Sequence, residues 1–119
     1  MSVKTYAYFF RILYNATYLG HTYSEKALEL LNNREFPDGI VAGVPENIPV
    51  AHKFGERTVE SPEGIVTTEE LHDCGIVYYP SKPYILCVMT KGTDIASLKE
   101  IIKTISKTVS DEVAAGFPG

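Results

Sequence analysis

Apolar residues recur at helical spacing near both ends of the chain. Near the N-terminus, intervals of three and four residues predict a helix from Ser2, its N-cap, to about Leu19. A second helix is expected to open at the capping box Thr22-Tyr23-Ser24-Glu25 and to end at Asn32-Asn33. The stripe of the first helix consists of Val3, Tyr6, Phe10, Leu13 and Thr17.

The longest apolar stripe predicts a C-terminal helix from about Asp94 to Ala115, which Gly116 and Pro118 should stop. Its aliphatic residues fall on one side and lysines lie on or near the other. We therefore expect this helix to be the main cover of a sheet. The aliphatic residues are Ile95, Leu98, Ile101, Ile102, Ile105, Val109 and Val113, and the lysines are Lys99, Lys103, Lys107 and, just before the helix, Lys91.

Two unbroken apolar runs, Gly75–Tyr79 and Tyr84–Thr90, predict strands. A strand with one wet face alternates apolar and polar residues, so these continuous runs indicate that both faces are covered. A third strand is expected around Lys53. Between them, Thr58–Glu70 is polar and contains a proline and a glycine, which predicts a surface connection. The predicted fold class is α+β, with N-terminal helices, three antiparallel strands and a long C-terminal covering helix.

Composition limits the function classes. The 119 residues lie in the usual single-domain range, so we expect one unit over residues 1–119. The net charge of -4, with scattered Lys and Arg, gives no basic surface, and no nucleic-acid partner is expected. The longest apolar run, Tyr84 to Met89, is far below the ~20 residues that span a bilayer, and no signal-peptide pattern begins the chain. The sequence as given therefore predicts a cytoplasmic protein, unless it derives from a longer precursor.

Metal-binding residue types are few and isolated. His21, His52 and His72 lack the spacing of a metal site, so neither a metal nor another cofactor is expected. Neighbouring residues on a strand point to opposite faces, so His72, Asp73 and Cys74 should not converge as a catalytic group.

The two cysteines are expected to be buried free thiols. If Ser81-Lys82 forms the hairpin tip, Cys87 lies opposite Ile76, one step away from Cys74. Such a diagonal offset is poor disulfide geometry. A disulfide is therefore the less favoured alternative.

The strongest motif evidence is the order of three segments. Val50-Ala51-His52-Lys53-Phe54-Gly55-Glu56 is followed by His72-Asp73-Cys74-Gly75-Ile76-Val77, and then by a proline-containing hairpin and the C-terminal amphipathic helix. This combination resembles the C-terminal portion of a serine β-lactamase or penicillin-binding-type (D-Ala-D-Ala carboxypeptidase-like) serine hydrolase. In that family a strand carries Lys-Thr-Gly or Lys-Ser-Gly on the active-site wall. The resemblance implies a β-lactam or a cell-wall peptide as substrate and an exported protein.

The resemblance also implies roles for four residues. Lys53 would attract the substrate carboxylate and support proton transfer around the nucleophile. Gly55 would let the substrate approach the strand, and the backbone N–H of Glu56 would be one of two oxyanion-hole donors. Phe54 stands where the family has a hydroxyl that bonds the substrate carboxylate, a loss of about 1.5–3 kcal/mol. His52 should face the other side of the sheet, packed or locally hydrogen-bonded.

Ser-x-x-Lys and Ser-Asp-Asn are absent, so the chain lacks the family's nucleophile and should be inactive alone. Three interpretations stay open: part of a hydrolase whose N-terminal half is outside this sequence, a stand-alone non-catalytic binding or assembly module, or a coincidental likeness. The direct entry into a helix at Ser2 favours the first. In the resembled fold two further strands pair beside Tyr84–Thr90, so this segment would be a bare edge, and self-association through it is expected.

Overall fold

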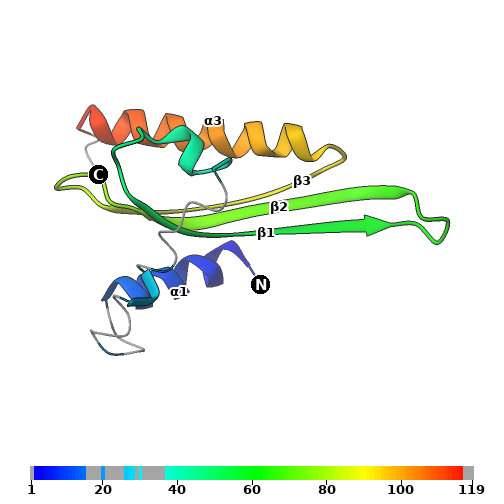
Figure 1. The fold of residues 1–119 in the computed structure, drawn as a ribbon, viewed down its shortest axis with the longest axis horizontal. Coiled ribbons are helices and arrows are strands. Elements are labelled where there is room, and N and C mark those ends of the chain that lie inside the picture. The colour runs from blue at the N-terminus through cyan, green and yellow to red at the C-terminus, as the bar shows by residue number, and fades with distance from the viewer. Residues whose placement is uncertain (1, 16–19, 21–25, 29, 31–36, 117–119) are drawn as a thin grey trace.

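A three-stranded antiparallel sheet, in the order β1-β2-β3, separates the helices into two layers. In the computed structural model, which describes residues 2–15, 20, 26–28, 30 and 37–116, α3 covers one face of the sheet and α1 the other (Figure 1). The predicted α+β fold is confirmed. The elements are α1 (Val3–Asn15), the short 3-10 helix η1 (Val41–Gly43), β1 (Val50–Glu60), β2 (Val66–Val77), β3 (Tyr84–Gly92) and α3 (Ile95–Ala114).

The N-terminal helix begins as the sequence predicts. The Ser2 hydroxyl oxygen accepts a hydrogen bond from the Thr5 N–H at 3.1 Å, which satisfies one of the unpaired donors of the first turn. From this helix Phe10 is buried against the sheet. The expected end of the helix near Leu19 and the capping box at 22–25 lie outside the described residues. Residues 26–28 and 30 are helical, in agreement with the predicted second helix.

Each face of the sheet has its own hydrophobic cluster, so the prediction of two covered faces is confirmed. On the α1 face, Phe10 packs with Cys74 and Ile76. The larger cluster lies on the α3 face, and Phe54 and Leu86 pack against it from the strands. The buried members of the larger cluster are Ile40, Val41, Val44, Ile48, Val50, Leu71, Val77, Val88, Leu98 and Ile102.

The orientation of α3 differs from the prediction of one fully buried aliphatic stripe. Ile101 and Ile105 are 46% and 38% exposed, whereas Ser106 and Ser110 are buried. The reason is the close approach of η1 to α3. The Ser106 hydroxyl donates to the Ile40 carbonyl oxygen at 2.7 Å, and only a small side chain fits between the two segments. One flank of the helix therefore carries exposed isoleucines.

The predicted surface connection at Thr58–Glu70 is wrong. β1 continues to Glu60 and β2 starts at Val66, so most of this segment forms a long two-stranded hairpin that extends beyond the helices (Figure 1). Its polar side chains reflect exposure on both faces, which removes the apolar pattern that marks a strand. The tight turn closes with the Ser61 N–H bonded to the Ile65 carbonyl oxygen at 2.8 Å.

The register of the β2–β3 hairpin also differs from the prediction. Val77 pairs with Tyr84, which leaves a six-residue loop, and Cys74 lies directly opposite Cys87. The structure joins the two cysteines in a disulfide, and no free cysteine remains. The expectation of free thiols was wrong because the hairpin tip lies one residue earlier, at Pro80-Ser81, where Ser81 adopts a φ of 67°.

No helix among the described residues has the length and apolar character needed to cross a bilayer.

Gly43 should be sensitive to substitution, because it lies against the backbone of α3. A Cβ atom at Gly43 would lie 2.6 Å from the Lys103 carbonyl oxygen and 2.5 Å from the Lys107 nitrogen. We predict that Gly43→Ala lowers the free energy of unfolding by about 1–3 kcal/mol, the usual cost of overpacking. Chemical denaturation measures this change. Ala42→Ser, at the exposed neighbouring position, is the control, and equal stability of both variants would contradict the prediction.

Candidate functional site

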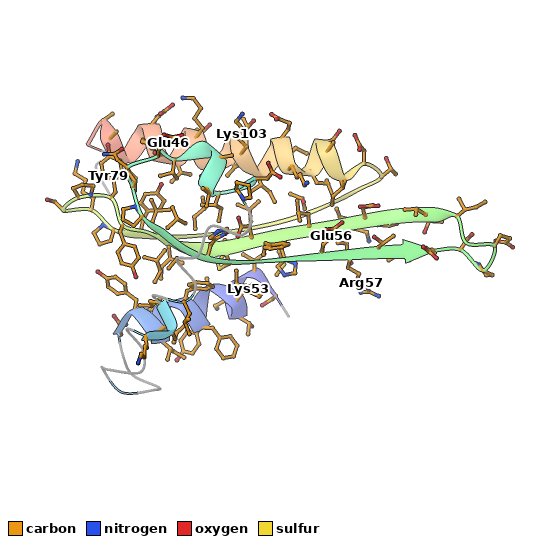
Figure 2. All side chains as sticks on the ribbon, in the orientation of Figure 1. Glu46, Lys53, Glu56, Arg57, Tyr79 and Lys103 are labelled. Carbon is orange, nitrogen blue, oxygen red and sulfur yellow. A yellow bond between two sulfur atoms is a disulfide. The ribbon has the colours of Figure 1, made fainter. Side chains whose placement is uncertain are left out.

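Lys53 lies in β1, which forms one edge of the sheet, with its side chain exposed on the face that α1 covers. The Tyr6 hydroxyl of α1 donates to the Lys53 carbonyl oxygen at 2.9 Å. The Lys53 ammonium lies 5.2 Å from the centroid of the Phe54 ring, within the range of a cation–π contact. Figure 2 shows Lys53, Glu56 and Arg57 along this strand. Helix α1 therefore fixes the backbone that carries the lysine.

The hydrogen-bond pattern gives the direction of each β1 backbone group. The Tyr78 N–H donates to the Pro49 carbonyl oxygen, so these two residues form a directly bonded pair next to the paired residues Val50 and Val77. Bonded and non-bonded pairs alternate along an antiparallel ladder. From the bonded pair Pro49 and Tyr78, every second pair along the ladder is hydrogen-bonded. The backbone groups of Lys53 are therefore bonded to those of Cys74. The 4.0 Å between the Cα atoms of Cys74 and Cys87 agrees, because the short distance marks a non-bonded pair on the other side of β2.

The same alternation turns the backbone groups of Phe54 and Glu56 away from β2. Their N–H and C=O groups point toward the outer edge of the sheet, whereas those of Lys53 and Gly55 point toward β2. An outward N–H group on an edge strand can bond to a ligand that lies along the strand. The Glu56 N–H thus has the direction that a backbone donor at this edge requires.

Gly55 lies beneath the imidazole of His72, which is its direct partner across the ladder. A Cβ atom at Gly55 would overlap the His72 ring. The ring in turn makes an edge contact with Tyr6, with 5.3 Å between centroids. Packing against His72 within the chain therefore requires glycine at this position, in addition to the substrate-approach role expected from the sequence.

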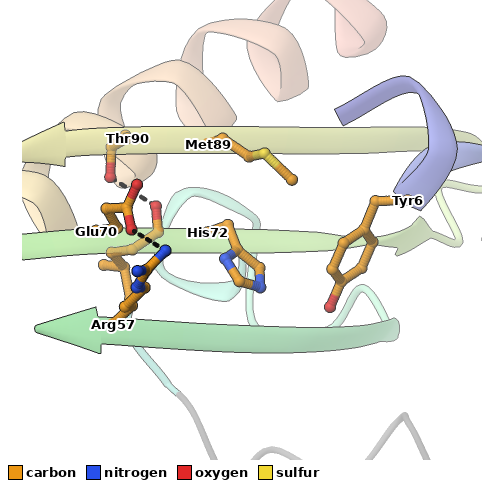
Figure 3. A pocket seen from close by; sticks show the side chains of 7 residues that line it. Tyr6, Arg57, Glu70, His72, Met89 and Thr90 are labelled. Carbon is orange, nitrogen blue, oxygen red and sulfur yellow. Dashed lines mark hydrogen bonds and ion pairs between the residues drawn. The ribbon is translucent and has the colours of Figure 1, made fainter. Parts of the chain in front are cut away.

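Beside His72 the α1 face of the sheet is hollowed, with a cavity volume of about 470 Å³ (Figure 3). An Arg57–Glu70 ion pair at 3.7 Å lies on its wall, and the Thr90 hydroxyl donates to the Leu71 carbonyl oxygen at 2.7 Å. The hollow offers groups of both charges next to the Lys53-Phe54-Gly55 segment. Its lining residues are Tyr6, Arg57, Glu70, Leu71, His72, Met89 and Thr90.

Sequence reasoning missed Arg57, Glu70 and Tyr6 as site residues. Arg57 lies four residues beyond Lys53, so its side chain lies on the same face of β1. The sequence predicts this shared face only if the strand is known to continue past Glu56. The polar composition of the segment Thr58–Glu70 predicts a surface connection, and that prediction ends the alternation of faces at Arg57. Tyr6 was assigned only to a packing stripe, and its hydroxyl bond to β1 depends on how the helix docks.

Behind the strand, His52 and Asp73 form a buried pair. His52 Nδ1 lies 2.9 Å from Asp73 Oδ1, and Asp73 Oδ2 accepts from the Ile40 N–H at 3.1 Å. Asp73 is 0% and His52 5% exposed. The prediction that His52 faces away from Lys53 and is locally hydrogen-bonded is confirmed. The expectation that His72, Asp73 and Cys74 do not converge is also confirmed, because Asp73 bonds to His52 on the opposite face.

The Phe54 ring packs against the core cluster on the α3 face. It therefore offers no polar group beside Lys53. Among the residues that the structure describes, no group of three or more His, Cys, Asp or Glu side chains could hold a metal ion. The polar groups that the described residues present along this part of the sheet are the Lys53 ammonium, the outward backbone N–H groups of β1 and the side chains of the hollow.

The model of the Beta-lactamase enzyme family matches residues 1–113, which is nearly the whole chain. The chain belongs to the β-lactamase enzyme family. The interpretation as a coincidental likeness is therefore wrong. A search of curated proteins found no match.

Solved structures place this β-lactamase-family chain in the same fold. The structure of PBP-A is 17% identical, with a TM-score of 0.73, and the match covers 92% of this chain and 38% of PBP-A. A mutant of PBP-A, described as an acyl-enzyme complex with penicillin-G, has the same values. A class A β-lactamase representative from Bacteroides cellulosilyticus DSM 14838 is 25% identical, with a TM-score of 0.74, over 94% of this chain and 41% of that one. The chain thus spans about two-fifths of the length of these relatives.

The buried carboxylate should be essential for the stability of this β-lactamase-family chain. Asp73→Asn leaves only one acceptor for the Ile40 N–H and His52, and an unsatisfied buried group costs about 1–3 kcal/mol. We expect a loss of that size in urea denaturation. The matched control is Asp111→Asn, whose carboxylate is exposed and bonded only to Lys107, and which should change stability by less than about 0.5 kcal/mol. Equal effects of the two substitutions would contradict this role.

The Tyr6 hydroxyl should contribute stability that depends on pH. Burial, and then the negative charge of Asp73, raise the pKa of the Tyr6 hydroxyl above its ordinary value of 10.0. Because the unfolded chain ionises first, this contribution is present below pH 10 and is lost as the pH rises through the folded pKa. Tyr6→Phe should lower stability by about 0.5–1.5 kcal/mol at neutral pH through the lost bond to Lys53. The difference between the two proteins should shrink above pH 10, and a constant difference in denaturation at pH 7 and 10.5 would contradict the prediction.

Proposed function

We propose that this chain is the C-terminal part of a β-lactamase-like serine hydrolase that acts on β-lactams or cell-wall peptides. The outer edge of β1 forms one wall of its substrate site. The chain carries no Ser-x-x-Lys motif and therefore no family nucleophile, so it is inactive in acyl transfer on its own.

The observation that carries this proposal is the direction of the Glu56 N–H. It points out of the sheet edge, three residues after Lys53 and next to the glycine of the Lys-x-Gly segment. A backbone donor fixed by a strand needs no reorganisation when negative charge develops on a carbonyl oxygen. In this proposal the Glu56 N–H is one of two oxyanion donors, and the second comes with the nucleophile.

Lys53 supplies the positive charge of the site. Its side chain is exposed on the α1 face, while its carbonyl is held by the Tyr6 hydroxyl. A lysine ammonium acts as a compact point charge, which suits attraction of a substrate carboxylate and support of proton transfer around the nucleophile. The ammonium lies 5.2 Å from the centroid of the Phe54 ring, a cation–π contact that involves no hydrogen bond.

Phe54 and Gly55 define what the substrate meets along the strand. Phe54 contributes an outward backbone N–H but no hydroxyl, so the carboxylate of the substrate depends on Lys53 for its charge partner. Gly55 places no side chain beneath His72. A substrate that lies along β1 borders the hollow that Arg57 and Glu70 line. A substrate with polar groups beyond its carboxylate fits this surface best.

The alternative is a stand-alone, non-catalytic module that binds the same ligands without turning them over. It is favoured by the two hydrophobic clusters that cover both faces of the sheet, within this chain, where the helices lie over it. The DNA upstream of Met1 distinguishes the two. If it encodes Ser-x-x-Lys and Ser-Asp-Asn in frame, it favours the hydrolase, and if it does not, it favours the module.

Benzylpenicillin should bind weakly at the β1 edge of the isolated chain. We expect amide resonances of Phe54 and Glu56 to shift on titration in two-dimensional NMR, with a Kd on the order of millimolar. Lys53→Ala should weaken binding by about tenfold, the value of one charged hydrogen bond. Lys91→Ala, an exposed lysine on β3, is the matched control and should leave the titration unchanged.

Intact-mass measurement of the same samples should show no acyl adduct, because the nucleophile is absent. A stoichiometric adduct on any serine would contradict the inactive chain. Shifts confined to residues away from β1, or equal effects of the two lysine variants, would contradict the assignment of the site.

A further inference from the structure

The hairpin of β1 and β2 continues beyond the part of the sheet that the helices cover (Figure 1). β1 runs past Glu56 to Glu60, so the edge of the proposed substrate site extends farther along the same strand. Because outward and inward backbone groups alternate, the N–H and C=O groups of Thr58 point outward as those of Glu56 do. Among the described residues, no backbone group outside the sheet bonds to Glu56 or Thr58. The edge therefore offers a second outward donor and acceptor about 7 Å from the first.

The outer side of β1 stays open whether or not further strands join the sheet. β1 and β3 are the two edges, with β2 between them. The additional strands that the family resemblance implies pair beside β3. They would therefore lie on the other side of the sheet from the Glu56 and Thr58 backbone groups.

The hairpin concentrates the negative charge of the chain. Residues 56–70 contain five glutamates and one arginine, a net charge of -4, which equals the net charge of all 119 residues. Arg57 pairs with Glu70 at 3.7 Å. Among the described residues, the other four glutamates have no ion-pair partner, and these are Glu56, Glu60, Glu63 and Glu69. The hairpin therefore attracts a cationic ligand and repels a second copy of itself.

The two faces of the hairpin present different side chains to a ligand at this edge. Strand alternation places Glu56, Thr58 and Glu60 on the α3 face, and Arg57 and the half-buried Val59 on the α1 face. Figure 2 shows Glu56 and Arg57 on opposite sides of β1. In an added strand, the side chain opposite Thr58 lies on the α3 face with a glutamate diagonally on each side, within reach of a long side chain. An ammonium group fits this position best.

We propose that the β1 edge from Glu56 to Glu60 binds the extended backbone of a peptide substrate that carries an ammonium group. This inference rests on the proposed function. With the substrate carboxylate at Lys53 and the reacting carbonyl at the Glu56 N–H, the peptide runs antiparallel to β1. The residue two positions before the reacting carbonyl then lies opposite Thr58 and exchanges two hydrogen bonds with it.

The extended edge distinguishes between the two substrate classes of the proposed function. The side chain of benzylpenicillin holds one amide and no peptide backbone, so it lacks the groups that pair with Thr58. A peptide of several residues uses both outward backbone pairs of β1 and places a positive charge between Glu56 and Glu60. Cell-wall peptides rather than β-lactams are therefore the class that this edge fits.

Three peptides test the edge in NMR titrations of the 119-residue chain. They are acetyl-Val-Lys-Val-D-Ala-D-Ala, the same peptide with Glu in place of Lys, and acetyl-D-Ala-D-Ala. We expect the lysine peptide to bind about tenfold more tightly than either of the others. The Thr58 amide resonance should shift with the lysine peptide and not with acetyl-D-Ala-D-Ala. In about 0.5 M NaCl the difference between the lysine and glutamate peptides should shrink, because salt screens exposed charges.

Two variants act on separate parts of the edge. Thr58→Pro removes the outward donor and keeps the bonds to β2, and Glu60→Lys reverses a charge beside the lysine of the peptide. Each should weaken binding of the lysine peptide by about tenfold and leave that of acetyl-D-Ala-D-Ala unchanged. Glu112→Lys, the same charge change at an exposed position of α3, is the matched control and should affect neither peptide. Circular dichroism checks that each variant folds.

The outcomes separate this inference from the proposed function. Equal affinities of the three peptides would overturn the extended edge, as would equal effects of Glu60→Lys and Glu112→Lys. Shifts of the Glu56 amide with acetyl-D-Ala-D-Ala would still support the substrate site in that case. Binding of the lysine peptide that Thr58→Pro weakens and Lys53→Ala does not would support the peptide edge and overturn the proposed function instead.

Discussion

The buried hydrogen bonds of Asp73 are the constraint on which the rest of the structure depends. One carboxylate oxygen holds His52 on β1 and the other holds the Ile40 N–H at the start of η1. Ser106 then joins the Ile40 carbonyl to α3. Asp73 therefore connects two strands and the segment between the helices and the sheet. A buried carboxylate is costly unless every partner is in place, so this network allows only one arrangement of these elements.

This network has a direct effect on the candidate site. His52 immediately precedes Lys53, and strand alternation turns the two side chains to opposite faces. The bond that fixes His52 in the core thus fixes Lys53 on the α1 face, where Tyr6 holds its carbonyl. The direction of the Glu56 N–H follows from the same register. A site whose donors are backbone groups needs a rigid strand more than it needs particular side chains.

The two edges of the sheet are chemically distinct. The β1 edge is next to charged residues, and a hollow with groups of both signs lies beside it. The β3 edge is uncharged and has exposed isoleucines nearby. Polar surroundings suit a small charged ligand that exchanges with water, whereas apolar surroundings favour a partner that stays bound. The hollow nevertheless reaches across the sheet, because Met89 and Thr90 of β3 line it together with Arg57 of β1.

The sequence by itself determined the element types, the family and the position of the Lys-x-Gly strand, because helical periodicity, continuous apolar runs and motif spacing are local signals. It also determined that His52 and Lys53 oppose each other, since alternation needs only the knowledge that the segment is a strand. Only the tertiary structure decided the register that joins Cys74 to Cys87, because one residue of difference at the hairpin tip moves every cross-strand pair. The hollow with Arg57 and Glu70, and the exposure of Ile101 and Ile105, were decided there as well. They depend on how α1 and η1 dock, and docking is set by packing between distant segments that no local pattern encodes.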